Sequence, residues 1–458
     1  LDSFSELKIG EAFVVTDVAS YSAVALASYG PELAGYNELE ALDEGRENTR
    51  WGVGAGLKKL MPRGVTHVAA DPGLHADAAG EAATLAAWRF EEFKAPYERS
   101  PVVSVDVLPG APGAGWERGA VRGRAQNWAR FLSDMPANNM TPTDLAQNAL
   151  DVLCPLGIKV TAHDKAWIEA NRMEAFLTVA RGSCEPPVFL ECEYQGAPGG
   201  PVVLIAAKGV TFDSGGLCLK PAAGMVENRG SMAGAAAALA ALKALAELKV
   251  PINVTLVAPL CENMISGQCM KVGDVVRALN GLSIQIEDTD MEGRLMLADA
   301  LVYGQAAYRP ALVIDIATLT HGILMATGGG CFGCFSNAEA LWGCARRAGA
   351  VAGDRPWRFP LWDYFARQVV DDPAVDLRNK GSGKATPCIG AAFLKKFVCG
   401  PWLHMDTTGV GKLAHAPPPY LCARRMTGRP ARTLVHTLLN IADSSDKPKE
   451  AKKDCPAA

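Results

Sequence analysis

The sequence lacks a long uninterrupted apolar run. Its most apolar candidate, residues 232–248, is rich in alanine but carries Lys243 and Glu247. A helix that spans a membrane needs about 20 consecutive, predominantly apolar residues. This stretch therefore predicts a buried helix in a globular protein, and no membrane insertion is expected.

Also absent is an excess of charge of one sign. The chain has 45 lysine and arginine residues against 49 aspartate and glutamate residues, which gives a net charge of -4. Proteins that attract nucleic acids or anionic membranes through electrostatics usually present a basic surface. The sequence therefore gives no reason to expect a nucleic-acid partner.

The cysteines lack a pairing pattern. Thirteen of them are scattered along the chain, and many, such as Cys192, Cys261 and Cys399, lie within apolar stretches. This usage is typical of reduced, buried thiols in an intracellular protein. The opening stretch LDSFSELKIGEAF has no signal-peptide layout, so we expect a location in the cytosol or the mitochondrial matrix.

The 458 residues exceed what one compact core usually holds, so two domains are expected. Short apolar runs and one helical pattern, DAAGEAATLAAWRFEEF, predict a small α/β domain over residues 1–120. In residues 121–443 strands alternate with helices, and the runs PVVLIAAKGV, INVTLVAPL and ALVIDIATLT are almost entirely apolar. Strands of this kind are covered by helices on both faces, which predicts an α/β domain around a mixed, largely parallel sheet. Residues 444–458 are polar and are expected to form a tail.

Two segments carry charged side chains that suit metal chemistry. KGVTFDSGGLCLKP contains Lys208, Asp213 and Lys220, and DTDMEGRLMLADAL contains Asp290, Glu292 and Arg294. Carboxylates in loops near a helix start suit hard or borderline divalent metals, and cationic side chains would face the anion that develops in hydrolysis. Taken alone, each residue also has a common structural explanation in turn formation, helix-dipole compensation or exposure of a lysine to water.

Together these segments resemble the signature motifs of the leucine aminopeptidase (cytosol aminopeptidase) family, which reads N-T-D-A-E-G-R-L at the second segment. Further likeness lies, in the expected order, in MPANNMTPT, PPVFLE, APLCENM, GDVVRALNG and PYLCARRMTGRPARTL, and it is weakest before about residue 120. The resemblance implies an N-terminal α/β domain, a C-terminal catalytic domain and a homohexamer. It also implies a peptide substrate, whose first peptide bond is attacked by water that two divalent metals (zinc, manganese or magnesium) activate.

The resemblance assigns a role to each charged residue. Asp213, Asp290 and Glu292 would hold the first metal, and Lys208, Asp213 and Glu292 would hold the second. Lys220 would polarise the scissile carbonyl, and Arg294 would hold a bicarbonate that shuttles a proton.

One position departs from the family pattern at the metal site. The family has a further Asp ligand for the second metal, and this chain has Ser231 there. A neutral hydroxyl is a poorer ligand than a carboxylate, and the change removes one negative charge next to two dications. We therefore expect one metal or none in this chain, with Lys208 protonated in the vacant charge site if the second metal does not bind. The alternative is that water fills in beside Ser231 and the second metal stays.

The substrate pocket departs as well. The resemblance places Asn228, Thr318, His321, Thr408 and Gly411 in it. His321 interrupts the family motif A-T-L-T-G, and its imidazole is expected to fill the pocket, with a new metal ligand and a shifted loop as alternatives. Asn228 and Gly411 stand where the family typically has Met, and Thr408 where it has Ala, so the pocket is expected to be more polar.

These departures favour a family member whose peptidase activity is impaired or lost, with the hexamer retained as a structural unit, as in the sperm paralogues of animals that have degraded active sites. Structural assembly partners are then expected. One alternative is an active metalloaminopeptidase with altered metal content and specificity. Another is a module that binds peptides without cleaving them. The three interpretations differ in the number of bound metals, in the openness of the pocket near His321 and in turnover.

Overall fold

The computed structural model describes residues 7–381, 384–411 and 417–444. Within these ranges, no helix combines the length and the apolar character that a membrane crossing requires. The tail predicted over residues 444–458 lies outside the described residues, except for Ser444.

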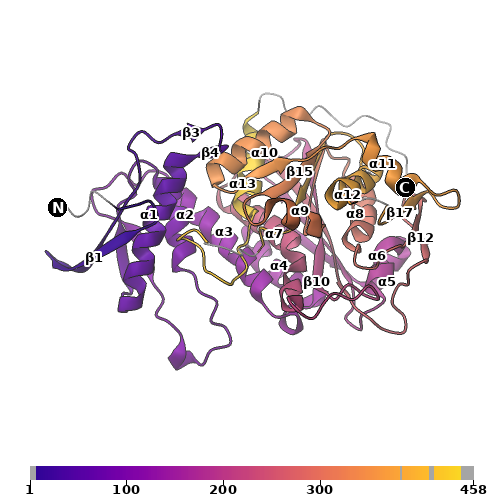
Figure 1. Ribbon diagram of the computed structural model, residues 1–458, viewed down its shortest axis with the longest axis horizontal. Helices are drawn as coiled ribbons and strands as arrows, with labels where there is room; N and C mark the ends of the chain where they lie inside the picture. The colour runs from indigo at the N-terminus through magenta and orange to yellow at the C-terminus, as the bar shows by residue number, and fades with distance from the viewer. Residues whose placement is uncertain (1–6, 382–383, 412–416, 445–458) are drawn as a thin grey trace.

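The N-terminal part consists of two helices and three small strand pairs, at the indigo end of the ribbon (Figure 1). Helices α1 (Glu44–Leu60) and α2 (Ala76–Ala87) pack against each other. The strand pairs are antiparallel β1 (Ala12–Val18) with β2 (Tyr21–Ala27), antiparallel β3 (Tyr36–Asn37) with β4 (Leu42–Asp43), and parallel β5 (His67–Ala70) with β6 (Ser104–Val107). The helix predicted from Asp77 is shorter than expected, because the backbone becomes extended at Trp88.

The larger part is built around a nine-stranded sheet in the order β16-β15-β18-β14-β9-β11-β8-β7, with β10 paired to β11. Its strands are β7 (Lys159–His163), β8 (Val188–Gln195), β9 (Val202–Ala207), β10 (Gly209–Asp213), β11 (Asn253–Asn263), β14 (Leu312–Ala317), β15 (Phe332–Ser336), β16 (Pro356–Arg358) and β18 (Trp402–Asp406). The central strands β11, β9, β14 and β18 run parallel, whereas β8 pairs antiparallel with β7 and β11, and β15 pairs antiparallel with β18. The predicted mixed, largely parallel sheet is thus confirmed, and the three quoted apolar runs form its centre.

Helices cover both faces of this sheet. One face packs against α3 (Trp116–Asp134), α4 (Pro142–Leu153), α7 (Ala233–Glu247), α10 (Glu339–Ala352) and α13 (Ala431–Asp443). The other packs against α5 (Lys165–Ala170), α6 (Glu174–Ala180), α8 (Gly293–Tyr308), α11 (Asp363–Val370) and α12 (Thr386–Leu394). Neighbouring residues of β9 alternate between the two cores, with Ile205 in one and Leu204 in the other, as the period of a strand requires. The alanine-rich stretch is the buried helix α7, as predicted.

A second, smaller sheet lies beside the main one. It contains β12 (Val275–Arg277), β13 (Ser283–Gln285) and β17 (Leu377–Arg378). Helix α9 (His321–Thr327) follows β14 directly and contacts α12 and β15.

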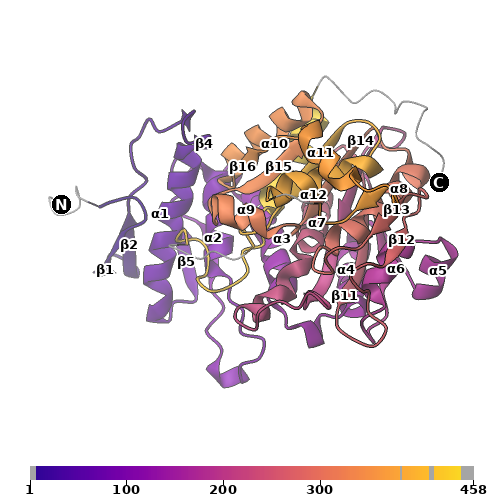
Figure 2. The same ribbon diagram turned by 45° about the vertical axis from the view of Figure 1, so that its right-hand side comes forward.

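Buried ion pairs fasten the N-terminal helices to the last helix. The Glu81 carboxylate of α2 has no exposed surface, and it contacts Arg50 of α1, Arg122 of α3 and Arg432 of α13 at 2.8, 2.5 and 2.7 Å. Figure 2 shows α1 and α2 at the left of the sheet, with α3 between them and the strands. The predicted domain boundary at residue 120 falls inside α3, which packs against both α2 and α7, and the boundary stays a prediction.

The described cysteines are mostly free thiols, as expected. Cys192 and Cys261 are buried and unbonded. Cys399 is an exception because it forms a disulfide, so the expectation of uniformly reduced thiols is wrong at this position.

Candidate active site

Three carboxylates converge at one edge of the main sheet. Asp213 is the last residue of β10, and Asp290 and Glu292 lie in the turn that leads into α8. One carboxylate oxygen from each residue lies within 4.8 Å of the others. The fold thus brings together two segments that are about 80 residues apart in the chain, because a strand end and a helix start meet where open α/β sheets hold their ligands.

Backbone and amide groups fix the Asp213 carboxylate. Its Oδ1 atom accepts hydrogen bonds from the Gly215 N–H at 3.0 Å and from Asn263 Nδ2 at 2.9 Å. Gly215 has φ +90°, and a Cβ there would lie 2.5 Å from the Cys218 carbonyl oxygen, so only glycine fits this turn. Asn263 ends β11 and also donates to the Thr289 carbonyl oxygen at 3.0 Å.

Two lysines interleave with the carboxylates. Lys208 follows β9, and its Nζ atom lies 2.6 Å from Glu292 Oε1 and donates to the Thr318 carbonyl oxygen at 2.9 Å. The contact with Glu292 is an ion pair without the geometry of a hydrogen bond. Lys220 Nζ lies 3.0 Å from Asp213 Oδ2 and also contacts Asp290. Three negative charges and two positive charges therefore share this site.

Burial and like charge perturb the acidic groups. Burial, followed by the negative charge of Asp213, raises the pKa of Glu292 to about 7 and that of Asp290 to about 6. Burial lowers the pKa of Lys220, but Asp213, Glu292 and Asp290 outweigh it, so the net shift is upward. The ammonium of Lys220 is thus held in its charged form.

Arg294 is the second residue of α8. Its Nη1 atom donates to the Asn379 carbonyl oxygen at 2.5 Å, while its Nε atom is buried without a hydrogen bond. Burial lowers the pKa of its guanidinium to about 10, against the charge of Glu292. A buried guanidinium with an unsatisfied N–H can donate a hydrogen bond to a small anion and bind it.

Ser231 lies next to the lysine side of the site. It belongs to the 3-10 helix η6 (Met225–Met232), which leads into α7, and it is buried. Its carbonyl oxygen accepts a hydrogen bond from Thr318 Oγ1 at 2.8 Å, and the Thr318 carbonyl oxygen accepts one from Lys208. Ser231 and Lys208 therefore border the same residue, Thr318.

Two of the predicted pocket residues, Thr318 and His321, lie in the loop after β14 or directly at its end. Asn228 lies in η6, and Thr408 and Gly411 follow β18. Thr318, Asn228, Thr408 and Gly411 are half-buried, and His321 is exposed at the first position of α9. Asp406, the last residue of β18, organises this loop: it accepts from the Thr320 hydroxyl at 2.6 Å and from the Thr408 hydroxyl at 2.9 Å. A Cβ added at Gly411 would meet no atom of the described part of the chain within 4 Å.

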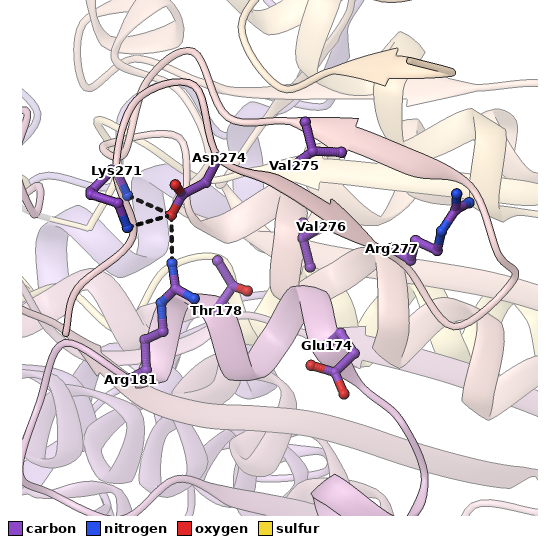
Figure 3. A pocket seen from close by; sticks show the side chains of 8 residues that line it. All are labelled: Glu174, Thr178, Arg181, Lys271, Asp274, Val275, Val276 and Arg277. Carbon is purple, nitrogen blue, oxygen red and sulfur yellow. Dashed lines mark hydrogen bonds and ion pairs between the residues drawn. The ribbon is translucent and has the colours of Figure 1, made fainter. Parts of the chain in front are cut away.

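A separate groove of about 430 Å³ lies between α6 and β12 (Figure 3). Three of its charged groups pair with one another, because Asp274 Oδ2 contacts Arg181 at 2.6 Å and Lys271 at 3.2 Å. No residue that the sequence assigned to metal or substrate lines this groove. The carboxylate cluster, rather than the groove, carries the candidate chemistry.

The donor set fits one divalent metal. Asp213, Asp290 and Glu292 supply oxygen ligands that are buried, close together and oriented by neighbouring groups, which suits manganese, magnesium or zinc. Lys208 contacts Glu292 on the side of the cluster where the Thr318 hydroxyl donates to the Ser231 carbonyl oxygen. Among the described residues, no fourth carboxylate joins the cluster.

Comparison with known proteins decides the family. The profile of the cytosol aminopeptidase family, catalytic domain, matches residues 127–435. This chain belongs to the cytosol aminopeptidase family. Its homologues are therefore aminopeptidase-type metallopeptidases, and the resemblance seen in the sequence motifs is confirmed.

Relatives within the cytosol aminopeptidase family match most of the chain. The cytosol aminopeptidase of Bos taurus is 42% identical over 431 residues, which are 93% of this chain and 82% of that protein. The cytosol aminopeptidase of Xenopus tropicalis is 40% identical over 430 residues, 92% of this chain and 82% of that protein. A solved structure of the bottromycin maturation enzyme BotP in complex with Mn is also similar, with a TM-score of 0.85, 30% identity, and coverage of 95% of this chain and 94% of that one.

Proposed function

We propose that this chain is a cytosol aminopeptidase family protein whose peptidase activity is impaired or lost, because its second metal position lacks a carboxylate. The observation that carries the proposal is the asymmetric donor set. Three carboxylates gather at Asp213, Asp290 and Glu292, while the residue whose carbonyl oxygen meets Thr318 on the side of Lys208 is Ser231, which carries no charge.

Charge balance supports the same conclusion. The Lys208 ammonium lies 2.6 Å from Glu292, which is one of the carboxylates needed by both metals. A protonated lysine has no lone pair to offer a metal, and an Asp at position 231 would add the negative charge that favours a second dication over the ammonium. With Ser231, the ion pair between Lys208 and Glu292 is the favoured arrangement on this side of the site.

The chain's other residues retain roles in peptide chemistry. A divalent metal bound by the three carboxylates would supply Lewis acidity to the peptide carbonyl and to the attacking water. The Lys220 ammonium, held charged by Asp213 and Asp290, would stabilise negative charge on the carbonyl oxygen. The unsatisfied Nε atom of Arg294 supports the binding of bicarbonate there as a proton carrier.

The proposal extends to assembly and location. By family resemblance the chain forms a homohexamer, which serves as a structural unit with further assembly partners. The cytosol and the mitochondrial matrix are the proposed compartments.

A second candidate is an active metalloaminopeptidase with altered metal content and first-residue preference. The intact carboxylate cluster favours it, as does Gly411, where a Cβ would meet none of the described residues within 4 Å. His321 is the residue proposed to restrict substrate entry, and its exposed side chain would narrow the pocket from the rim.

Hydrolysis of a leucyl amide in excess manganese or zinc tests these proposals. The unmodified chain is compared with Ser231→Asp, and with Ser231→Asn as a neutral control of the same size; bound metal per chain is measured for all three. We expect no turnover and at most one metal for the unmodified chain and for Ser231→Asn, and turnover with two metals for Ser231→Asp. Loss of one ion of a two-metal site costs several kcal/mol of transition-state stabilisation, so the difference should reach about a thousandfold or more.

Two outcomes would contradict this expectation. Turnover by the unmodified chain at a rate ordinary for the family would refute the impaired site and favour the second candidate. Two metals in Ser231→Asp without turnover would move the cause to His321, which His321→Gly in the same background then tests.

A further inference from the structure

An ion pair borders the turn that carries two of the three clustered carboxylates. Asp288 opens the motif DTDMEGRL, where the family motif has Asn. Its Oδ1 atom accepts a hydrogen bond from the Asp290 N–H at 3.0 Å, and its Oδ2 atom accepts one from Lys380 Nζ at 3.0 Å. An Asn side chain could make the first contact but not the second, because its amide has a single acceptor oxygen and no charge.

The pair belongs to a longer polar contact between two segments, which continue the parallel strands β13 and β17. Asn379 Oδ1 accepts from the Glu287 and Asp288 N–H groups at 2.8 and 3.3 Å, and its Nδ2 atom donates to the Asp288 carbonyl oxygen at 2.7 Å. Glu287 Oε2 accepts from the Gly381 N–H at 3.1 Å. The chain that leads to Asp290 is thus fastened to the segment that follows β17.

The same segment also holds the guanidinium of the site. The Asn379 carbonyl oxygen accepts from Arg294 Nη1 at 2.5 Å. Residues 379 and 380 therefore contact Arg294 directly and reach Asp290 through Asp288. Because Asp213 comes from a different element, β10, the position of Asp290 relative to Asp213 depends on how firmly this segment is held.

We propose that Asp288 and Lys380 form a clamp that positions Asp290 for binding a divalent metal. The inference rests on the proposed metal site at Asp213, Asp290 and Glu292. Asp288 lies outside that cluster among the described residues, and its two oxygens face the ligand turn and the ammonium. Asp288 and Lys380 are therefore positioning residues, and the metal is held by the other three carboxylates.

Replacement of Lys380 separates positioning from charge. If only Coulomb attraction counted, removing a cation near the site would strengthen the binding of a dication. Loss of the clamp acts in the opposite direction, because the turn that carries Asp290 must then be ordered when the metal binds, which costs conformational entropy. The sign of the change in affinity for Lys380→Met tells the two apart.

The first measurement is a titration of the full chain with manganese. We expect Lys380→Met and Asp288→Asn each to weaken binding by about three- to fivefold, which is the range of a partly exposed ion pair. The double variant should bind no more weakly than either single one, since both remove the same contact. Lys380→Arg, which keeps the charge, should retain the affinity of the unmodified chain.

Lys159→Met is the matched control. Lys159 pairs with Glu193 at 2.7 Å, with 72% and 18% of the two side chains exposed, against 49% and 17% for Lys380 and Asp288. Its strand, β7, is an edge strand of the main sheet. This control should leave the affinity for manganese unchanged.

The second measurement is amide hydrogen exchange of residues 287–292 in the metal-free protein, followed by mass spectrometry. Lys380→Met and Asp288→Asn should exchange faster in this segment than the unmodified chain, because a weakened clamp opens more often, and Lys159→Met should not. This readout needs no metal. Absence of manganese binding by the unmodified chain would refute the proposed metal site, and exchange would still decide the clamp.

Two results would overturn the clamp. One is manganese binding by Lys380→Met that is tighter than, or equal to, that of the unmodified chain. The other is unchanged exchange of residues 287–292 in both Lys380→Met and Asp288→Asn.

Discussion

Lys208 Nζ and Glu292 Oε1 lie 2.6 Å apart, and only 3% and 2% of the two side chains is exposed. A buried pair of this kind costs a large desolvation free energy, which the mutual attraction of the charges offsets only while both partners are present. The pair therefore makes the metal-free protein sensitive to the loss of either charge.

Replacement of Lys208 tests this dependence. Above about pH 8, where Glu292 is ionised, Lys208→Met should lower the free energy of unfolding of the metal-free protein by about 3–5 kcal/mol, since the Glu292 carboxylate is left buried without its cation. The double variant Lys208→Met/Glu292→Gln should recover part of this loss. Urea unfolding in the presence of a chelator measures all three changes, and strictly additive losses would show that the two side chains are not coupled.

The raised pKa of Glu292 predicts opposite effects of pH with and without metal. Its folded-state value of about 7 lies above the ordinary 4.5, so between these values the folded protein keeps a proton that the unfolded chain has lost. The free energy of unfolding of the metal-free protein should therefore fall as pH rises through this window. Manganese requires deprotonated carboxylates, so the stabilisation that it adds should grow over the same window.

Unfolding curves with chelator and with manganese, recorded across that pH window, check this prediction. Glu292→Gln should flatten both pH dependences. The raised pKa of Glu292 would be contradicted if the unmodified metal-free protein became more stable as pH rises while Glu292→Gln did not.

Glu81 should be among the most sensitive positions for stability. Glu81→Gln leaves Arg50, Arg122 and Arg432 buried around a neutral amide, and we expect a loss of about 3–5 kcal/mol in the free energy of unfolding. Glu169→Gln is the matched control, because Glu169 pairs with Lys165 on the surface with more than half of each side chain exposed. The control should change stability by less than about 1 kcal/mol; equal losses would mean that the buried network is not special.

Two glycines at the pocket should respond differently to alanine. Gly409 has φ +97°, and a Cβ there would lie 2.6 Å from the Gly328 carbonyl oxygen, whereas a Cβ at Gly411 meets none of the residues that the structure describes within 4 Å. Gly409→Ala should therefore destabilise the protein by about 1–3 kcal/mol, and Gly411→Ala should lie within about 0.5 kcal/mol of the unmodified chain. Thermal unfolding distinguishes them, and equal stability of the two variants would contradict the geometry.

The centre of the fold was predictable because its strands are marked by apolar runs in the sequence. β9, β11 and β14 are almost entirely apolar, and such runs fit a sheet that is buried on both faces. The small sheet of β12, β13 and β17 was not predicted. Its strands have two or three residues, which is too short for an apolar period to appear.

The candidate site was predictable in its charged residues and not in the groups that orient them. Motif resemblance named the carboxylates and lysines that the structure brings together. Asn263 and Asp406 were missed, because a single polar residue at the end of an apolar strand gives no periodic pattern. Both are the last residues of buried strands, β11 and β18. Their position at a strand end, where open α/β sheets bind ligands, could have identified them.

The contact between Glu81 and Arg432 also bears on how the protein is made. The two residues are separated by 351 positions, so a ribosome adds 351 residues after Glu81 before the third arginine can reach the carboxylate. Until then the N-terminal helices hold Glu81 with only two of its three cationic partners. A product that terminates before α13 would lack Arg432, and its Glu81 carboxylate would have one cationic partner fewer. This difference at Glu81 would distinguish truncated chains from chains that include α13.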